Sequence, residues 1–156
     1  MRPAETDTLT KIRVLLHRDL QTPRGERLWA EPLGSDLYRV RNTPFFAKDL
    51  NFGDVVRAIR SVRNVLPTVT EVVSASGHRT LRVAFAQEAS PTEVADVLKS
   101  LESRKATHER ARGSLFAIDV EPEADYQDIC DYLWQLEQRG VLEYETGATA
   151  TSRGSN

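Results

Sequence analysis

The sequence is poor in the residues from which disulfide frameworks and metal sites are built. It has one cysteine, Cys130, which excludes an intrachain disulfide and every metal motif made of several cysteines. Its three histidines, His17, His78 and His108, are far apart in the chain, and we expect no metal and no cofactor. Cys130 lies on the apolar side of a predicted helix, so we interpret it as a buried structural thiol rather than a nucleophile.

Long apolar runs are also missing. No stretch approaches the roughly 18 apolar residues that a membrane-spanning helix needs, and the first ten residues, MRPAETDTLT, lack the apolar core of a secretion signal. We therefore expect a cytoplasmic protein without a membrane partner. The phosphate loop, the dinucleotide fingerprint, the HExxH motif and the nucleophile elbow are absent as well, which favours a non-catalytic protein.

The charges of the 156 residues are unevenly divided along the chain. Residues 1–86 contain 14 Lys and Arg against 9 Asp and Glu, a net charge of +5, whereas residues 87–156 contain 7 against 14, a net charge of −7. The first part would favour phosphates or an acidic partner, and the second a basic partner. Alternatively, the two parts attract each other. The length fits one domain or two very small ones.

Aromatic residues gather in the stretch 28–57, which holds one of the two Trp, one of the four Tyr and three of the five Phe. Two alternating runs, 28–33 and 37–41, flank Gly34-Ser35-Asp36, a pattern that predicts a tight β-hairpin. Asn42-Thr43-Pro44 then ends the second strand, because proline lacks an N–H. Phe52-Gly53-Asp54 predicts a second turn.

The first half is predicted to be all β. After a mobile leader over residues 1–10, further strands are expected at 11–17, 69–73 and 78–86, joined by turn residues. Residues 54–66 fit a helical period ending at Pro67, but they also fit a strand at 55–59. We expect a bent antiparallel β-meander or small open barrel of about five strands over residues 11–86.

The pattern changes after residue 87. Ser90-Pro91-Thr92-Glu93 predicts a helix start that runs to about Arg104, and Asp125 caps a second helix that ends before Gly140. Residues 105–112 are expected to be a polar connection, and strands are expected at 114–120 and 141–145. We therefore expect an α+β fold, in which residues 78–145 form a ferredoxin-like β-α-β-α-β part with two helices on one face of a sheet. The strand 78–86 is shared between this part and the meander. Residues 146–156 are expected to be a disordered tail.

Two groups of residues are candidate sites. The first is a pocket at the rim of the meander, where carboxylate, imidazole and amide groups would meet aromatic rings and support acid–base chemistry; its members are Trp29, Glu31, Asn42, Phe45, Phe46, Asp54, His78 and Arg82. The second is an acidic face for a basic protein partner, formed by Glu121, Glu123, Asp125, Asp128 and Asp131. Both have a structural alternative, since such side chains also satisfy turn backbones and helix starts, and rings fill small cores.

The motifs LWAEPLG, NTPFFA, GDVV and SGHRTLR occur in this order between Leu28 and Arg82. In these segments the chain resembles a bacterial family known only as domain of unknown function 4265, and the resemblance extends over residues 12–144. It implies no activity. In that family the segment after GDVV resembles a strand and a turn rich in Gly and Asp, which favours the strand at 55–59, although Arg60–Asn64 is basic here and has neither residue.

Three functions follow as hypotheses. The first is a regulatory or immunity-type factor that binds another protein, for which the acidic second half favours a basic partner. The second is a small-molecule or enzymatic pocket at the rim. The third is single-stranded nucleic-acid binding by the basic first half, with rings that stack on bases; the acidic second half argues against this third function.

Overall fold

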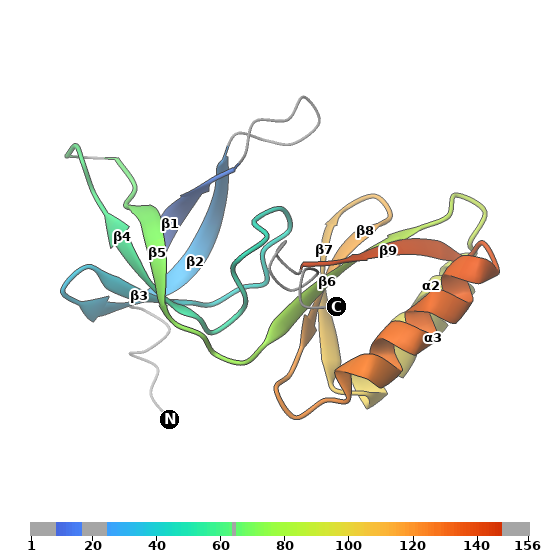
Figure 1. Cartoon of the computed structure of the whole chain (residues 1–156). Coiled ribbons are helices and arrows are strands. Elements are labelled where there is room, and N and C mark those ends of the chain that lie inside the picture. The colour runs from blue at the N-terminus through green and yellow to red at the C-terminus, as the bar shows by residue number, and fades with distance from the viewer. Residues whose placement is uncertain (1–8, 17–24, 64, 148–156) are drawn as a thin grey trace. The chain divides into compact units, whose positions relative to one another are not determined.

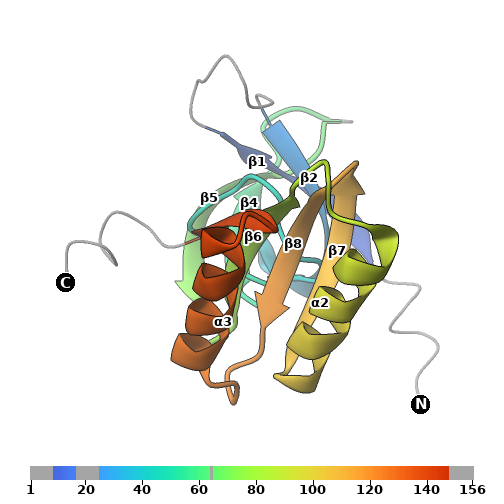
Figure 2. The same cartoon turned by 90° about the vertical axis from the view of Figure 1, so that its right-hand side faces the viewer.

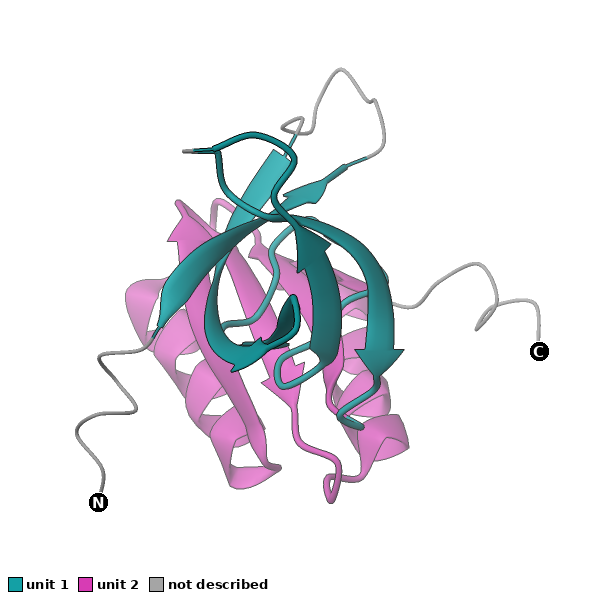
Figure 3. Cartoon of the chain, turned by 90° about the vertical axis from the view of Figure 1, so that its left-hand side faces the viewer, with its two compact units in different colours: residues 1–77 teal, residues 78–156 magenta. Residues whose placement is uncertain are grey.

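The computed structural model describes residues 9–16, 25–63 and 65–147 of the chain. The chain divides into two compact units, residues 1–77 and residues 78–156, with the boundary between Gly77 and His78 (Figure 3). Residues 1–8 of the leader predicted at 1–10, and residues 148–156 of the predicted tail, lie outside the described residues, whereas Thr10 belongs to the first strand. No helix among the described residues is long and apolar enough to cross a membrane.

The first unit is a closed five-stranded barrel with strand order β1-β2-β3-β4-β5 (Figure 1). Its strands are β1 (Thr10–Leu15), β2 (Gly25–Gly34), β3 (Leu37–Val40), β4 (Val55–Ile59) and β5 (Thr68–Ser74). Successive strands pair antiparallel, and the barrel closes where β1 and β5 run parallel, with Arg13 opposite Thr68. The barrel is therefore closed rather than open, because two strands far apart in sequence meet at its seam.

The alternation of apolar residues builds the interior of the barrel. Inward side chains on the strands form an aliphatic core, completed by two residues of the β3–β4 connection; its buried members are Ile12, Leu28, Ala30, Val40, Ala47, Leu50, Val56 and Ala58. The predicted hairpin is confirmed, with Ser35 and Asp36 both at positive φ (55° and 65°), as a type I′ turn between twisted strands requires. The strand at 55–59 is confirmed as well, and the helical alternative is wrong.

The second unit contains four strands and two helices in the order β6 (Arg79–Phe85), α2 (Pro91–Ser103), β7 (Ala106–Arg112), β8 (Leu115–Val120), α3 (Tyr126–Gln138) and β9 (Leu142–Thr146). The strands form one antiparallel sheet in the order β7-β8-β6-β9, and both helices cover the same face (Figure 2). The predicted α+β class is confirmed. The core lies between sheet and helices, with Leu81, Ile118, Leu101, Ile129 and Leu133 fully buried.

Three boundary predictions are corrected. Residues 106–112 form the strand β7 rather than a polar connection, so the unit runs β-α-β-β-α-β. The strand β6 pairs with β8 and β9 and is not a barrel strand, so it is not shared by the two parts. The last strand continues to Thr146, and the buried Gly147 donates its N–H to the Thr80 carbonyl at 2.7 Å.

Both predicted helix starts are confirmed. The Ser90 hydroxyl accepts a hydrogen bond from the N–H of Glu93 at 3.1 Å, with Pro91 in the first turn. The Asp125 carboxylate accepts one from the N–H of Asp128 at 3.0 Å. Each contact satisfies a backbone donor that has no partner inside the helix.

Candidate functional site

The polar residues of the stretch 28–57 hold the local backbone together. The Asn42 Oδ1 accepts a hydrogen bond from the N–H of Trp29 at 2.7 Å. The two carboxylate oxygens of Asp54, which is only 2% exposed, accept from the N–H groups of Asn51 and Ser76, both at 2.9 Å. Asp54 thus joins the turn at Asn51 to Ser76, and Asn42 joins the segment after β3 to β2. Both side chains hydrogen-bond to backbone groups, as the structural alternative predicts.

Sequence analysis missed the residue that orders the NTPFFA segment. The buried carboxylate of Glu26, on β2, accepts hydrogen bonds from three successive backbone N–H groups, those of Phe45 at 2.6 Å, Phe46 at 3.0 Å and Ala47 at 2.9 Å. A carboxylate can accept this many donors because it has two oxygens. Glu26 lies in a strand about twenty residues earlier, so only the fold reveals this contact.

The aromatic rings of the same stretch do not fill the barrel core, which is aliphatic. Tyr38 packs against that core from its edge, while Phe45 and Phe46 are half-buried. Trp29 is 45% exposed on the outer side of β2, and the Lys11 ammonium lies 4.5 Å from the centre of its ring. The rings therefore belong to the surface and the loops of the barrel.

The remaining two residues of the predicted pocket, His78 and Arg82, belong to the second unit. His78 precedes β6, and its Nδ1 lies 2.9 Å from the Oδ1 of Asp119 on β8. Arg82 is buried on β6, with Ala117 and Glu145 opposite it on the neighbouring strands. Six of the eight predicted pocket residues thus lie in one unit and two in the other. Of the six, Trp29 and Asn42 are joined by the hydrogen bond from the Trp29 N–H to the Asn42 Oδ1.

The His78–Asp119 pair is the arrangement in the second unit that most resembles acid–base machinery. The side chain of Asp119 is 9% exposed and that of His78 21%. Burial raises the pKa of the Asp119 carboxyl, and the adjacent imidazole of His78 acts in the opposite direction. A carboxylate that holds an imidazole in one orientation occurs in catalytic sites, but the same contact also satisfies a buried carboxylate.

Several arginines of the barrel have acidic or carbonyl partners nearby. Glu31 pairs with the guanidinium groups of Arg39 at 3.2 Å and Arg41 at 3.7 Å. Arg57 pairs with Glu71 at 2.9 Å. These ion pairs argue against nucleic-acid binding by the barrel. Each guanidinium would have to give up its carboxylate partner in order to bind a phosphate of the nucleic-acid backbone.

The acidic run of the second unit divides into structural and exposed members. Asp125 caps α3, and the carboxylate of Asp128 forms an ion pair with Arg104. Asp131 accepts a hydrogen bond from the Gln127 side chain at 2.9 Å and stays exposed. The exposed Glu123 and the half-buried Glu121 lie in the connection before α3. Asp131, which lies on the outer side of the helix, is the member best placed to meet a partner.

Trp134 on α3 is an exposed residue that the sequence analysis did not identify as a candidate site residue. The inward side of this helix buries Ile129, Leu133 and Leu136, while the Trp134 side chain is 54% exposed. Its position directly after Leu133 rotates it away from the apolar stripe of the helix, and this spacing could have predicted its exposure. Large exposed aromatic residues of this kind are enriched where proteins bind one another.

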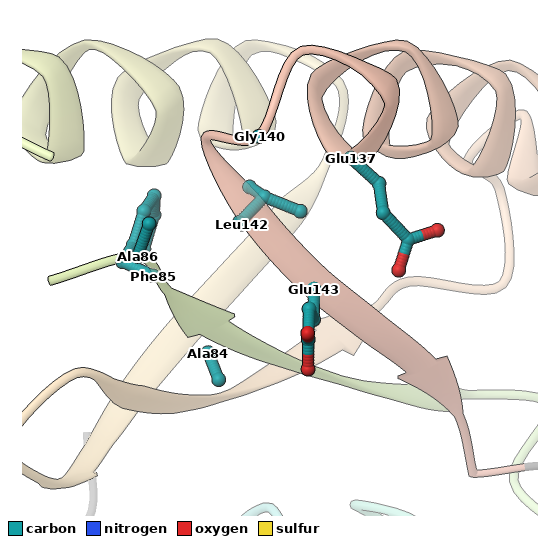
Figure 4. A pocket seen from close by; sticks show the side chains of 7 residues that line it. All are labelled: Ala84, Phe85, Ala86, Glu137, Gly140, Leu142 and Glu143. Carbon is teal, nitrogen blue, oxygen red and sulfur yellow. The ribbon is translucent and has the colours of Figure 1, made fainter. Parts of the chain in front are cut away.

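A pocket of about 440 Å³ lies beside the C-terminal end of α3 (Figure 4). It is formed by the end of β6, the turn after α3 and the start of β9; its lining residues are Ala84, Phe85, Ala86, Glu137, Gly140, Leu142 and Glu143. The Glu137 Oε2 also accepts a hydrogen bond from the N–H of Tyr144 at 3.3 Å. The two carboxylates lie on different sides of β9, because Glu137 comes from α3 on the helix-covered face whereas Glu143 pairs with Ala84 on the opposite face (Figure 4).

Cys130 has the environment of a structural thiol. It is half-buried on α3 beside Tyr126, and burial raises the pKa of its thiol. Burial also raises the pKa of Tyr126 to about 12, while the Arg79 guanidinium lies 4.0 Å from the centre of the Tyr126 ring. In the described part of the chain, no group of three or more His, Cys, Asp or Glu side chains could hold a metal ion.

Comparison with known families identifies the chain. A family model described as a domain of unknown function, DUF4265, matches residues 26–144. The chain belongs to this family. The resemblance inferred from the four motifs is thereby confirmed. The DUF4265 assignment carries no activity, and no curated protein matches the chain.

A solved structure shares the fold of this DUF4265 protein. It is described as the crystal structure of a hypothetical protein from Neisseria gonorrhoeae, with a TM-score of 0.75 and 18% sequence identity. The match covers 89% of the present chain and 95% of the Neisseria chain. At this identity the likeness establishes the α+β fold alone.

Proposed function

We propose that this DUF4265 protein is a non-catalytic bacterial protein of the cytoplasm that acts by binding another protein, as a regulatory or immunity-type factor. The single observation that carries the proposal is the exposed Trp134 on the outer side of α3, one helical turn from the exposed Asp131. We call these two residues, with Gln138 one turn further on, the Trp134 surface. Tryptophan contributes more than most residues to protein interfaces.

The charge of the second unit supports a basic partner. Residues 78–156 contain 9 Lys and Arg against 14 Asp and Glu, a net charge of −5. The ferredoxin-like arrangement expected for this unit leaves the outer side of α3 uncovered by its own sheet. An acidic unit with an exposed tryptophan accelerates encounter with a basic protein and offers it a packing site.

Affinity capture from the native host, with the full chain as bait at low salt, tests the proposal. Wild-type protein should retain one stoichiometric protein partner, whereas Trp134→Ala and Asp131→Lys should retain much less. Trp29→Ala is the matched control, because Trp29 is a similarly exposed tryptophan on the barrel. Capture that is insensitive to Trp134→Ala would contradict the proposal.

The His78–Asp119 pair supports a second candidate function, an acid–base site in the second unit. The 2.9 Å contact would hold the imidazole in one orientation, as general acid–base catalysis requires. The buried carboxylate of Asp119 gives the same contact a purely structural use. Comparing the stability and the activity of His78 variants separates the two.

A further inference from the structure

The outer side of the barrel gathers positive charge around its exposed tryptophan. On β2, Leu28 and Ala30 are buried in the barrel core, so Trp29 between them points outward. Lys11 on β1 is the direct cross-strand partner of Trp29, and its ammonium lies 4.5 Å from the centre of the ring. On the other side of β2, the N–H of Arg41 donates to the carbonyl of Trp29 at 2.9 Å. A cation therefore flanks Trp29 on each side.

The adjacent pair of residues on β1 and β2 adds two guanidinium groups. Arg13 is opposite Arg27 in the strand register. Each lies two positions from Lys11 or Trp29 along its strand, so its side chain is on the same outer side. The Arg13 guanidinium donates to the neutral hydroxyl of Thr68 at 3.0 Å, and no carboxylate in the described part of the chain forms an ion pair with Lys11, Arg13 or Arg27. Like charges directly opposite each other destabilise a sheet, so an anion bound between Arg13 and Arg27 would be favoured.

The carboxylate of Glu31 borders this group of cations without neutralising it. Its Oε1 lies 3.2 Å from the Nη1 of Arg39 and 3.7 Å from the Nη1 of Arg41. One negative charge thus faces two positive ones, and the Arg41 side chain is 45% exposed, so Arg41 can bind a second carboxylate. We call the following residues the Trp29 surface: Lys11, Arg13, Arg27, Trp29 and Arg41.

Two features of the Trp29 surface favour a polypeptide over a nucleic acid. The Lys11 ammonium lies over the Trp29 ring, where a base would have to stack, whereas a carboxylate can bind Lys11 in place. Leu15, the next outward residue of β1 after Arg13, is 62% exposed and lies opposite Gly25. It offers an apolar contact that suits a protein side chain and not a phosphate.

We propose that the Trp29 surface binds an extended acidic segment of another protein. The inference goes beyond the proposed function, because this surface belongs to the first unit and fits a partner of the opposite charge. The cations of neighbouring rows are two residues apart along β1 and β2, about 7 Å, which is also the spacing of alternate side chains in an extended peptide. Because the contact is small, binding is expected to be weak and rapidly reversible.

Fluorescence anisotropy of a dye-labelled peptide, titrated with the full chain, tests the proposal in solution. The peptide is about six residues long, with glutamate at alternate positions, serine between them and a terminal leucine. Binding should be saturable and should weaken as salt is added. The same peptide with glutamine in place of glutamate should bind at least about tenfold more weakly. The absence of saturable binding, or equal binding of the two peptides, would overturn the proposal.

Matched variants locate the binding. Arg27→Glu should weaken peptide binding about tenfold, and it keeps the fold because it places a carboxylate opposite Arg13. Arg63→Glu is the control, since Arg63 is an exposed arginine of the same unit outside the Trp29 surface. Trp29→Ala should also weaken binding, whereas Trp134→Ala should not. Equal losses in Arg27→Glu and Arg63→Glu would show a diffuse charge effect and refute the surface.

Other occupants of the surface give different results. An oligothymidylate of similar length that binds more tightly than the peptide, and is lost in Arg27→Glu, would assign the surface to nucleic acid and overturn the proposal. Salt-dependent self-association of the full chain, abolished by Arg27→Glu in sedimentation, would assign it to a second copy and overturn the proposal as well.

The outcomes also separate this inference from the proposed function. Peptide binding that depends on Arg27 and is unchanged by Trp134→Ala supports the Trp29 surface, whether or not a basic protein is captured. Capture that depends on Trp134, together with no binding of the acidic peptide, refutes the Trp29 surface and leaves the proposed function standing.

Discussion

The Nδ1 of His78 lies 2.9 Å from the Oδ1 of Asp119, a carboxylate that is almost completely buried. Replacing His78 by alanine would remove this contact. A buried charged acceptor that loses its hydrogen bond costs about 1–3 kcal/mol of stability. We therefore expect His78→Ala to lower the free energy of unfolding by about that amount in urea denaturation at pH 7.

A double-mutant cycle with Asp119→Asn shows whether the loss comes from the pair. Because burial raises the pKa of Asp119, the carboxyl gains its proton on acidification and no longer needs the imidazole. The difference between wild type and His78→Ala should therefore shrink as the pH falls through the folded-state pKa of Asp119. A variant that keeps its stability but loses a biological activity would instead support the acid–base function.

Glu26 is expected to be a main determinant of barrel stability. Its carboxylate accepts three backbone hydrogen bonds from residues 45–47, and glutamine offers only one acceptor oxygen. Glu26→Gln should cost about 2 kcal/mol or more, measured as the free energy of unfolding. Glu31→Gln, on the same strand but at partly exposed ion pairs, should cost less than about 1 kcal/mol.

Gly147 is expected to tolerate no side chain. A Cβ added there would lie 2.8 Å from the Thr80 carbonyl oxygen and 3.1 Å from the Arg82 Nη1. Gly147→Ala must therefore move residue 147 away from β6, which would break the hydrogen bond from its N–H to the Thr80 carbonyl, expose that N–H to hydrogen exchange and lower the melting temperature. Gly25→Ala, whose added Cβ would find its nearest neighbour at 3.4 Å, is the control and should melt close to wild type.

The free energy of unfolding should fall in alkaline solution because of the ionisation of Tyr126. Its pKa rises from 10.0 to about 12 on folding, chiefly because of burial. The unfolded chain therefore loses this proton first, and between pH 10 and 12 its ionisation favours unfolding. Tyr126→Phe should flatten the decline of the urea midpoint across this interval. A decline identical to that of wild type would rule out the contribution of Tyr126.

Local patterns were sufficient to predict most elements of this fold. The hairpin at Gly34-Ser35-Asp36 and the helix starts at Ser90 and Asp125 depend on residues within a few positions of each other, and the structure confirms all three. The strand β7 was missed because its sequence, ATHERAR, is polar and mixed in propensity. Its place in the sheet comes from pairing with β8, a tertiary effect that overrides propensity.

The candidate site was harder to predict, because its contacts join distant segments. Barrel closure by β1 and β5, the Glu26 contacts with residues 45–47, and the His78–Asp119 pair each join residues at least 19 positions apart. The single sequence placed His78 among residues of the barrel, yet its partner lies on β8. Trp134 was visible in the sequence, but its exposure follows from which side of α3 faces the sheet.

The hydrogen bond from the Tyr144 N–H to Glu137 also bears on how the protein behaves at high concentration. The strand β9 lies at an end of the sheet, and an N–H that donates to Glu137 points away from β6. Such groups on an edge strand can recruit a strand from another molecule and start aggregation. Here one donor is already occupied, and the exposed carboxylates of Glu143 and Glu145 flank it. This edge is therefore a poor template for strand addition.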